Sequence, residues 1–292
     1  MLARLKQGVI QAEVSLVNGR SVISSLRQRM PLRVSSPLYP VSQQTVSFFI
    51  MNPAAGLLQG DQHTIYLCVK EGAQAVVLGQ GATKVFRSPQ RNFSRQFTTI
   101  RVEAGARLEY LPDVVIPFAE SCLLSRTNIL VSSKASALFW EINAPGRVAR
   151  QELFAYHKLD QQTNVYIDRE LIFSDRFVLE PSSIPSELQS WHNPLGLVHG
   201  YTHTGTFWTI DPNAEQAIGQ LLQRNTEEEE GYLEKIAGKY SVLLAGTKLT
   251  SQAYCFRALG RSADNIQAAF KELWQFFRNR LFNQPAWPWR KY

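Results

Sequence analysis

The 292-residue sequence has few cysteines and a low share of charged residues. Its three cysteines, Cys68, Cys122 and Cys255, form neither a CxxC pair nor an even set that would build a disulfide framework. We interpret them as small buried apolar residues, and their number favours a reducing compartment. Charged residues make up 19% of the chain and hydrophobic residues 45%, which is a globular composition.

Blocks of basic residues and long apolar runs are also missing. The net charge of +7 comes from scattered Lys and Arg, and the only charge block, Glu227 to Glu230, is acidic. This distribution argues against nucleic acid and suits an acidic protein partner. No apolar run approaches the ~20 residues that cross a bilayer, and the N-terminal segment lacks the apolar core of a signal peptide. We therefore expect a cytoplasmic protein with neither nucleic-acid nor membrane partners.

Motifs that identify common enzyme classes are absent. The sequence has no GxSxG, P-loop, HExxH or dinucleotide-binding fingerprint. His199 and His203 have the i, i+4 spacing of a helical metal site, but two glycines and several threonines surround them and disfavour a helix. On a strand the same spacing would separate the rings by ~13 Å, too far to share an ion. The sequence therefore predicts no catalytic residue and no tightly bound cofactor.

Patterns of β-strands dominate the chain up to about residue 210. Asn18-Gly19, between two β-prone runs, predicts a hairpin turn. Further strands are predicted by alternating or continuous apolar runs, at residues 45–51, 65–69, 75–78, 93–99, 108–111, 123–131, 137–142, 148–156, 164–173, 176–179 and 240–245.

A weak internal repeat accompanies these strands. The segment Val69 to Ala73 is echoed by Val102 to Ala106 about 33 residues on, and Ser133 to Ala137 resembles a third copy. Each copy is a turn that leads into a short apolar strand. Repeats of roughly 20–50 residues indicate stacked coils or layered sheets, whereas chance recurrence of Gly-Ala turns is the alternative.

Two helices are predicted near the C-terminus. Asp211-Pro212 has the residues of a helix start, and Ser262 precedes a long amphipathic helix over residues 263–281. The aromatic face of the second helix has two interpretations, packing in the core or docking to a partner. The candidate partner-binding residues are Phe270, Trp274, Phe277 and Arg278.

The stretch from Asn52 to Ser88 combines glycine turns with a charged cluster of Asp61, Lys84 and Arg87. Other charged residues, Glu109, Glu141 and Arg147 among them, lie within or beside apolar β runs. Charges in such places need partners or water. A wet internal channel would supply water, and ordinary surface salt bridges would supply partners.

Several sequence blocks, in this order, resemble the UreD (also called UreH) family of urease accessory proteins. They are NPAAGLLQGD, GQGATKVFRS, LEYLPDVVIPF, PGR followed by QELF, and RALGRSADNIQAAFKELW, and they cover most of residues 30–274. Where the family usually has a glycine pair, this chain has Ala54-Ala55.

The resemblance implies a mainly β fold, a two-layered helicoid resembling a solenoid, with a few helices. It implies a single UreD-like domain over residues 1–292, with a β-rich body to about residue 210 and a mixed helix and strand part over about 211–292. It also implies a non-enzymatic chaperone that binds apo-urease together with UreF and the GTPase UreG. Such a factor conveys Ni²⁺ transiently through an internal water-filled tunnel for metallocentre assembly.

The same resemblance provides candidate tunnel-lining residues. They are Asp61, which closes the GD block, Thr83 and Lys84 of the ATK block, Glu109, and Glu141 and Arg147 near the PGR block. The oxygen atoms of the Asp, Glu and Thr side chains among them would hold a divalent cation weakly enough to release it. The alternative function is a β-solenoid carbohydrate-active enzyme that pairs two carboxylates among Asp61, Glu109 and Glu141.

Overall fold

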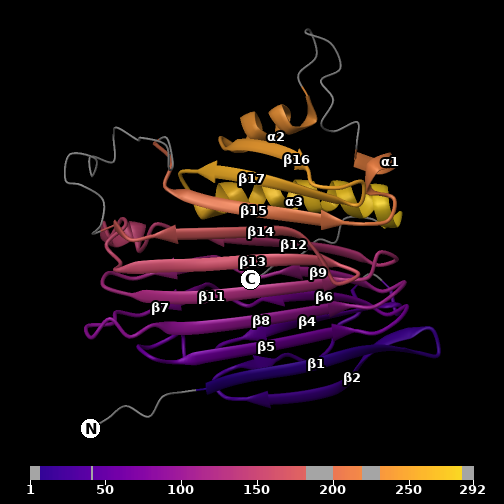
Figure 1. Ribbon diagram of the computed structural model, residues 1–292, viewed down its shortest axis with the longest axis horizontal. Coiled ribbons are helices and arrows are strands. Elements are labelled where there is room, and N and C mark those ends of the chain that lie inside the picture. Colours follow the sequence, from indigo (N-terminus) through magenta and orange to yellow (C-terminus); the bar gives the residue numbers. More distant parts are fainter. Residues whose placement is uncertain (1–6, 41, 182–199, 219–230, 285–292) are drawn as a thin grey trace.

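The computed structural model describes residues 7–40, 42–181, 200–218 and 231–284, and these residues form two facing β-sheets (Figure 1). Sheet A has seven strands, in the spatial order β14 (Glu170–Leu179), β13 (Lys158–Ile167), β11 (Cys122–Val131), β8 (Ser94–Val102), β5 (Gln62–Val69), β1 (Gln7–Val17) and β2 (Arg20–Arg29).

Sheet B has ten strands. Eight follow the order β16 (Leu243–Lys248), β17 (Ala253–Gly260), β15 (His203–Ile210), β12 (Ser136–Asn143), β9 (Arg107–Leu111), β6 (Gln74–Gly79), β4 (Thr45–Met51) and β3 (Arg33–Val34), while β7 (Thr83–Val85) and β10 (Val115–Pro117) pair beside them. The helices are α1 (Ala214–Ile218), α2 (Tyr232–Tyr240), α3 (Ala263–Phe282) and the short 3-10 helix η1 (Val148–Arg150).

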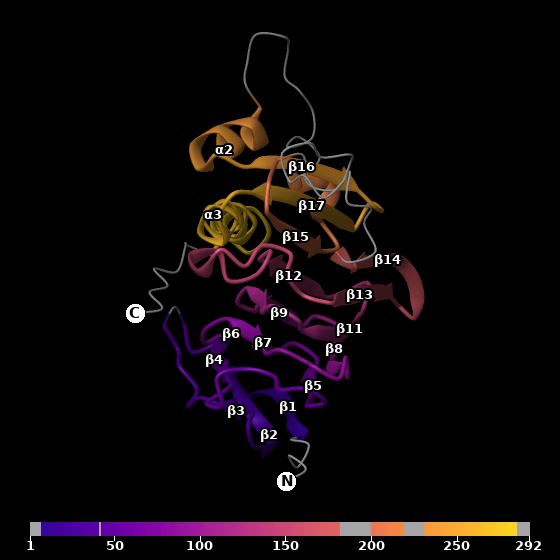
Figure 2. The same cartoon turned by 90° about the vertical axis from the view of Figure 1, so that its left-hand side faces the viewer.

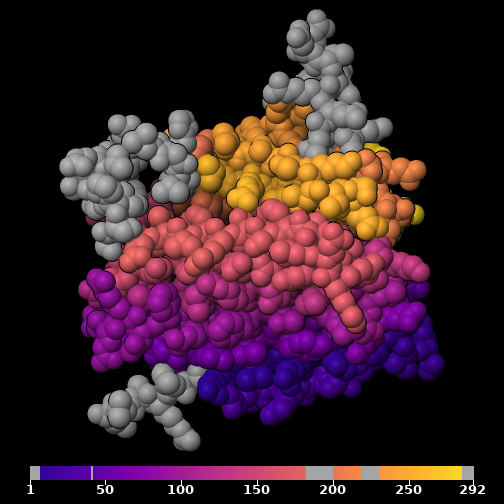
Figure 3. Space-filling view, in the orientation of Figure 1, coloured from indigo at the N-terminus to yellow at the C-terminus, as the bar shows by residue number. Residues whose placement is uncertain are grey.

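From β4 to β13 the chain alternates between the two sheets and stacks its coils in sequence order. The neighbouring strands β4, β6, β9 and β12 are parallel in sheet B, and β1, β5, β8, β11 and β13 are parallel in sheet A. Antiparallel strands flank both parallel stacks. The colour bands of Figure 3 show this succession on the surface. The predicted mainly β, layered architecture is confirmed.

The predicted repeat corresponds to stacked turns between coils. Gly72 and Gly105 both adopt positive φ angles, of 69° and 66°. The Gly72 amide donates to the Ala104 carbonyl at 3.2 Å, and the Gly105 amide donates to the Lys134 carbonyl at 2.9 Å. The alanine that follows each turn is buried, at positions 73, 106 and 135. Each coil therefore covers the apolar start of the next one, which is what a stacked repeat requires.

The core has two layers. A large apolar cluster and a smaller one around Val85, Leu123 and Leu159 lie between the sheets. A further cluster lies between sheet B and α3, which packs on the outer face of β12, β15 and β17 (Figure 2). Strands on both sides of residue 210 belong to sheet B, so the C-terminal part extends the same sheet. No helix among the described residues has the length and apolarity needed to cross a membrane.

Local predictions had mixed outcomes. The hairpin turn at Asn18-Gly19 is confirmed, with φ angles of 50° and 77°. The strand predicted over 148–156 is wrong, because η1 and turns with positive φ at Gln151 and Phe154 replace it. The strand predicted over 164–173 is interrupted by a tight turn at Asp168-Arg169, which has positive φ at both positions without a glycine to signal it.

Candidate functional site

Sheet A presents two rows of polar side chains to sheet B. In one row, paired residues on β5, β8, β11 and β13 are His63, Gln96, Ser125 and Gln161. In the next row, on β8, β11, β13 and β14, they are Thr98, Thr127, Thr163 and Asp175. The following rows on these strands are apolar, beginning with Leu67, Ile100, Ile129 and Val165. The row on their other side is also apolar and includes Leu123, Leu159 and Leu179. The polar rows therefore form a band between two apolar parts of the interior.

Sheet B faces these rows with polar groups of its own, Tyr110, Glu141 and Asn143. We call the two rows and these three residues the polar seam. Glu141 Oε1 accepts a 2.8 Å hydrogen bond from the hydroxyl of Thr163, which joins the sheets directly. Burial raises the pKa of Glu141, hydrogen bonds from Thr163 and Thr127 oppose the shift, and the charge of Asp175 adds to it.

Several buried polar atoms of the seam have no hydrogen-bond partner among the described residues. They include His63 Nε2, Asn143 Oδ1 and Gln161 Oε1. Buried polar groups in folded proteins are almost always paired, and water supplies the partner where protein does not. The seam therefore has the chemistry of a hydrated interior rather than that of a dry core.

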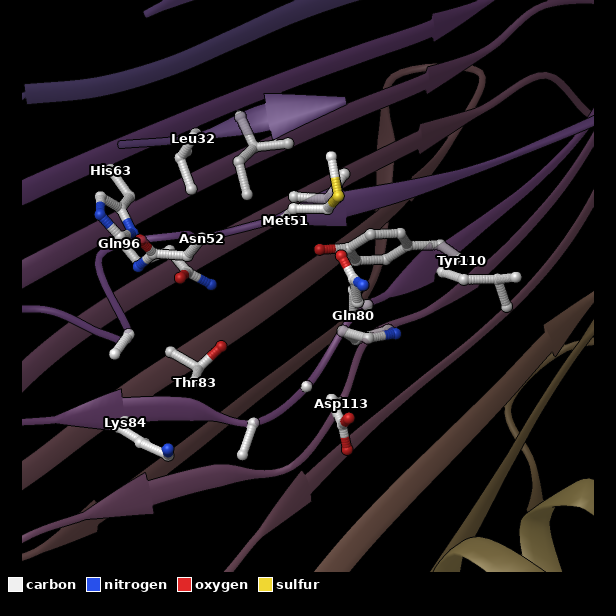
Figure 4. Close-up of a pocket in the computed structure, with 18 residues that line it drawn as sticks. Leu32, Met51, Asn52, His63, Gln80, Thr83, Lys84, Gln96, Tyr110 and Asp113 are labelled. Atoms are coloured by element: carbon white, nitrogen blue, oxygen red, sulfur yellow. The ribbon is translucent and has the colours of Figure 1, made fainter. Parts of the chain in front are cut away.

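A cavity lies at each end of the polar seam. The first, of about 190 Å³, is lined by His63, Gln96 and Tyr110 together with Thr83 and Lys84. Figure 4 shows Asn52, His63 and Gln96 gathered at one end of it and Gln80, Tyr110 and Asp113 at the other. The second, of about 260 Å³, is lined by Glu141, Asn143, Gln161, Thr163 and Asp175.

Three of the five sequence blocks that carry the resemblance meet beside the first cavity. Leu57 donates to the Lys84 carbonyl at 2.8 Å and accepts from the Phe86 amide at 2.9 Å, which joins the NPAAGLLQGD and GQGATKVFRS blocks. A Cβ at Gly56 would lie 2.3 Å from the Lys84 carbonyl oxygen, so only glycine allows this approach. A Cβ at Gly79 would lie 2.6 Å from the Asp113 amide, which joins the LPDVV segment.

Three of the predicted lining residues lie at the cavities. Thr83 and Lys84 line the first cavity, and the Lys84 side chain is exposed. Glu141 lines the second. Asp61 is buried beside the same loop, where its Oδ2 accepts a 3.0 Å hydrogen bond from the Leu58 amide and closes the GD turn. Its placement is that of a turn-forming residue.

Glu109 lies on the outer face of sheet B, away from the polar seam. It is fully buried and accepts hydrogen bonds from Trp274 Nε1 at 2.5 Å and from Arg278 Nη1 at 2.5 and 2.6 Å. The Arg107 guanidinium adds an ion pair at 3.5 Å. Glu109 therefore anchors α3, and the prediction that it lines an interior path is wrong.

Arg147 also serves the local structure. Its Nε donates to Glu152 Oε2 at 2.7 Å, and its guanidinium lies 4.2 Å from the centre of the Phe118 ring. A Cβ at Gly146 would clash with the Glu152 carbonyl oxygen. This clamp joins the PGR and QELF blocks, and Arg147 lines neither cavity.

The four candidate partner-binding residues on α3 are inside the chain. Phe270, Trp274, Phe277 and Arg278 have exposed fractions of 0–1%. A partner cannot reach these side chains while α3 is packed on sheet B. Of the two interpretations, core packing is the one that the structure shows, because Glu109 and the aromatic cluster of sheet B occupy this face.

The three carboxylates of the enzyme alternative do not form a pair in one cleft. Glu109 points to α3 from the outer face of sheet B, whereas Glu141 points to sheet A. Asp175, which sequence reasoning missed, lies near Glu141 but is ion-paired with Arg257 at 3.0 Å. No group of three or more His, Cys, Asp or Glu side chains in the described part of the chain is arranged to hold a metal. His203 is buried, and His199 lies outside the described residues.

The comparison with known families agrees with the convergent blocks. The family model described as "UreD urease accessory protein" matches residues 6–291. The chain belongs to the UreD family. Similar proteins include the urease accessory protein UreD of Bacillus cereus (strain ATCC 10987 / NRS 248), with 24% identity over 98% of both chains. That of Actinomyces naeslundii has 27% identity over 98% of both chains. That of Bordetella pertussis (strain Tohama I / ATCC BAA-589 / NCTC 13251) has 29% identity over 92% of this chain and 90% of its own.

Proposed function

We propose that this chain is a urease maturation factor that performs no chemistry of its own and conveys Ni²⁺ along the polar seam. In this proposal it acts in the cytoplasm, in a complex with apo-urease, UreF and the GTPase UreG. Family membership supports the link to urease. The observation that supports conduction is the polar seam, which carries buried unpaired polar atoms and has a cavity at each end.

The ligand chemistry of the seam suits cargo that must leave again. Hydroxyl, amide and carboxylate oxygens are weak ligands for a borderline cation such as Ni²⁺. Glu141 provides carboxylate oxygens inside the seam, and the hydrogen bond from Thr163 orients them. Because no three strong ligands converge among the described residues, a cation would be held only transiently. We therefore propose transient Ni²⁺ occupancy and no resident cofactor.

The decisive experiment is expression of the urease subunits with UreF and UreG, with and without this chain. We expect urease to contain nickel and to be active only when the chain is present. Equal nickel content and equal activity without it would refute the maturation role.

A point variant then separates conduction from assembly. Glu141→Ala should lower the nickel content of urease while the accessory proteins still co-purify. Glu170→Ala, which changes an exposed glutamate at the start of β14, is the matched control and should leave nickel content unchanged. If Glu141→Ala urease were fully loaded, the path would not pass this carboxylate.

A further inference from the structure

The first cavity contains one imidazole, that of His63, among amide, hydroxyl, thioether and carboxylate groups, the Asp113 carboxylate included. The His63 ring is 2% exposed and lines the cavity wall. Its Nε2 atom has no hydrogen-bond partner among the described residues. Gly8 makes room for this ring, since a Cβ there would lie 3.0 Å from His63 Cδ2. A buried imidazole nitrogen is thus held at the cavity without a protein group to satisfy it.

We propose that His63 Nε2 is a ligand for a borderline-soft divalent cation such as Ni²⁺ in the first cavity, and that this nitrogen selects against Mg²⁺ and Ca²⁺. Imidazole suits Ni²⁺, Zn²⁺ and Cu²⁺, whereas Mg²⁺ and Ca²⁺ take oxygen ligands. The rest of the seam offers mainly oxygen atoms, which do not discriminate in this way. His63 is therefore the residue of the seam that selects Ni²⁺ over Mg²⁺ and Ca²⁺.

The neighbours of His63 supply a weak remainder of the coordination sphere. Asn52 and Gln96 lie beside the ring at the same end of the cavity, and the Met51 thioether also lines it (Figure 4). Lys84 also lines the cavity, and its positive charge opposes a bound cation. One nitrogen, amide oxygens and water thus give selectivity with easy release. This inference deepens the proposed function by adding a selective binding step to it.

The test uses the full chain labelled with ¹⁵N-histidine and titrated with NiCl₂ or MgCl₂. Paramagnetic Ni²⁺ should broaden the ring signals of one of the five histidines, that of His63, before the others. Mg²⁺ should leave it unchanged. Preferential broadening of another histidine, or an equal response to Mg²⁺, would overturn the proposal. This measurement needs no variant.

A pair of variants tests the affinity. His63→Phe fills the same space without a nitrogen, and we expect it to weaken Ni²⁺ binding at least tenfold in equilibrium dialysis, since even the groups that orient a metal ligand contribute 10–100-fold. His157→Phe is the control, because His157 lines neither cavity, and it should bind as the unmodified chain does. Unchanged affinity in His63→Phe would contradict the inference.

The outcomes also separate this inference from the proposed function. If Ni²⁺ does not reach His63 but urease still depends on the chain for its nickel, the selective site is absent and the maturation role stands. If Ni²⁺ binds His63 but urease matures equally well without the chain, the maturation role fails and the binding site stands.

Discussion

Glu141 is the carboxylate whose environment gives the clearest expectation for the effect of pH. Burial raises its pKa above the ordinary value of 4.5, so the folded protein binds this proton more tightly than the unfolded chain does. The protonated form therefore stabilises the fold, and that contribution is lost as the pH rises from about 4.5 through the folded pKa.

Replacement of Glu141 by glutamine isolates this effect. Below pH 4.5 the unmodified chain and Glu141→Gln should be similarly stable. Above it, the unmodified chain should lose stability relative to the variant. Thermal unfolding of both proteins from pH 4 to pH 8 measures the difference, and a difference that did not change with pH would contradict the burial of this charge.

Substitutions at the adjacent residues Ala55 and Gly56 should change the stability of the chain in opposite directions. Ala55 has a φ of 67°, a conformation that favours glycine, so Ala55→Gly should stabilise the chain by up to about 1 kcal/mol after the entropic cost of glycine. Gly56→Ala would place a Cβ 2.3 Å from the Lys84 carbonyl oxygen and should destabilise it by about 1–3 kcal/mol. Denaturant unfolding distinguishes the two signs, and a stabilising Gly56→Ala would show that the loop can move apart from β7.

At the scale of elements, the attachment of α3 to sheet B rests on a buried charge pair. Arg278 and Glu109 both have no exposed side-chain area. Arg278→Met leaves Glu109 buried without its main partner and should cost about 3–5 kcal/mol. Arg280 on the same helix is exposed, so Arg280→Met should produce no measurable change in the same denaturant series.

A double variant tests whether the two charges act as a pair. Glu109→Gln combined with Arg278→Met removes both, so its cost should be smaller than the sum of the two single costs. Strict additivity would mean that α3 is held by its apolar face alone.

The sequence predicts the turns and helix caps better than it predicts the contacts that form in the interior between distant parts of the chain. Local signals were sufficient for the Asn18-Gly19 hairpin, for the stacked turns at Gly72 and Gly105, and for the cap at Ser262, whose hydroxyl accepts from the Asp264 amide. The partner of Glu109 is Arg278, 169 residues away, and no local pattern connects them. The seam depends on strand register, which places Thr98, Thr127 and Thr163 side by side only after folding.

At the scale of the whole molecule, we predict that substitutions on the two faces of one strand affect the nickel content of urease differently. Thr98 on β8 is buried and faces sheet B, whereas Thr99 beside it faces outwards and is half-buried. Thr98→Val removes a seam hydroxyl and keeps the shape of the side chain. We expect it to lower the nickel content of co-expressed urease, and Thr99→Val to leave that content unchanged. Equal nickel content in the two would argue that the cation avoids this row.

The stacking of coils sets the length of the polar seam. The polar seam runs across the strands, from His63 on β5 to Asp175 on β14, and so it advances by one strand spacing, about 4.8 Å, with each strand it crosses. Four such steps give a span of about 19 Å. Inserting or deleting a whole coil would lengthen or shorten the seam by one strand spacing per sheet and would leave the side chains of the other strands unchanged. The number of stacked strands thus fixes the length of the polar seam.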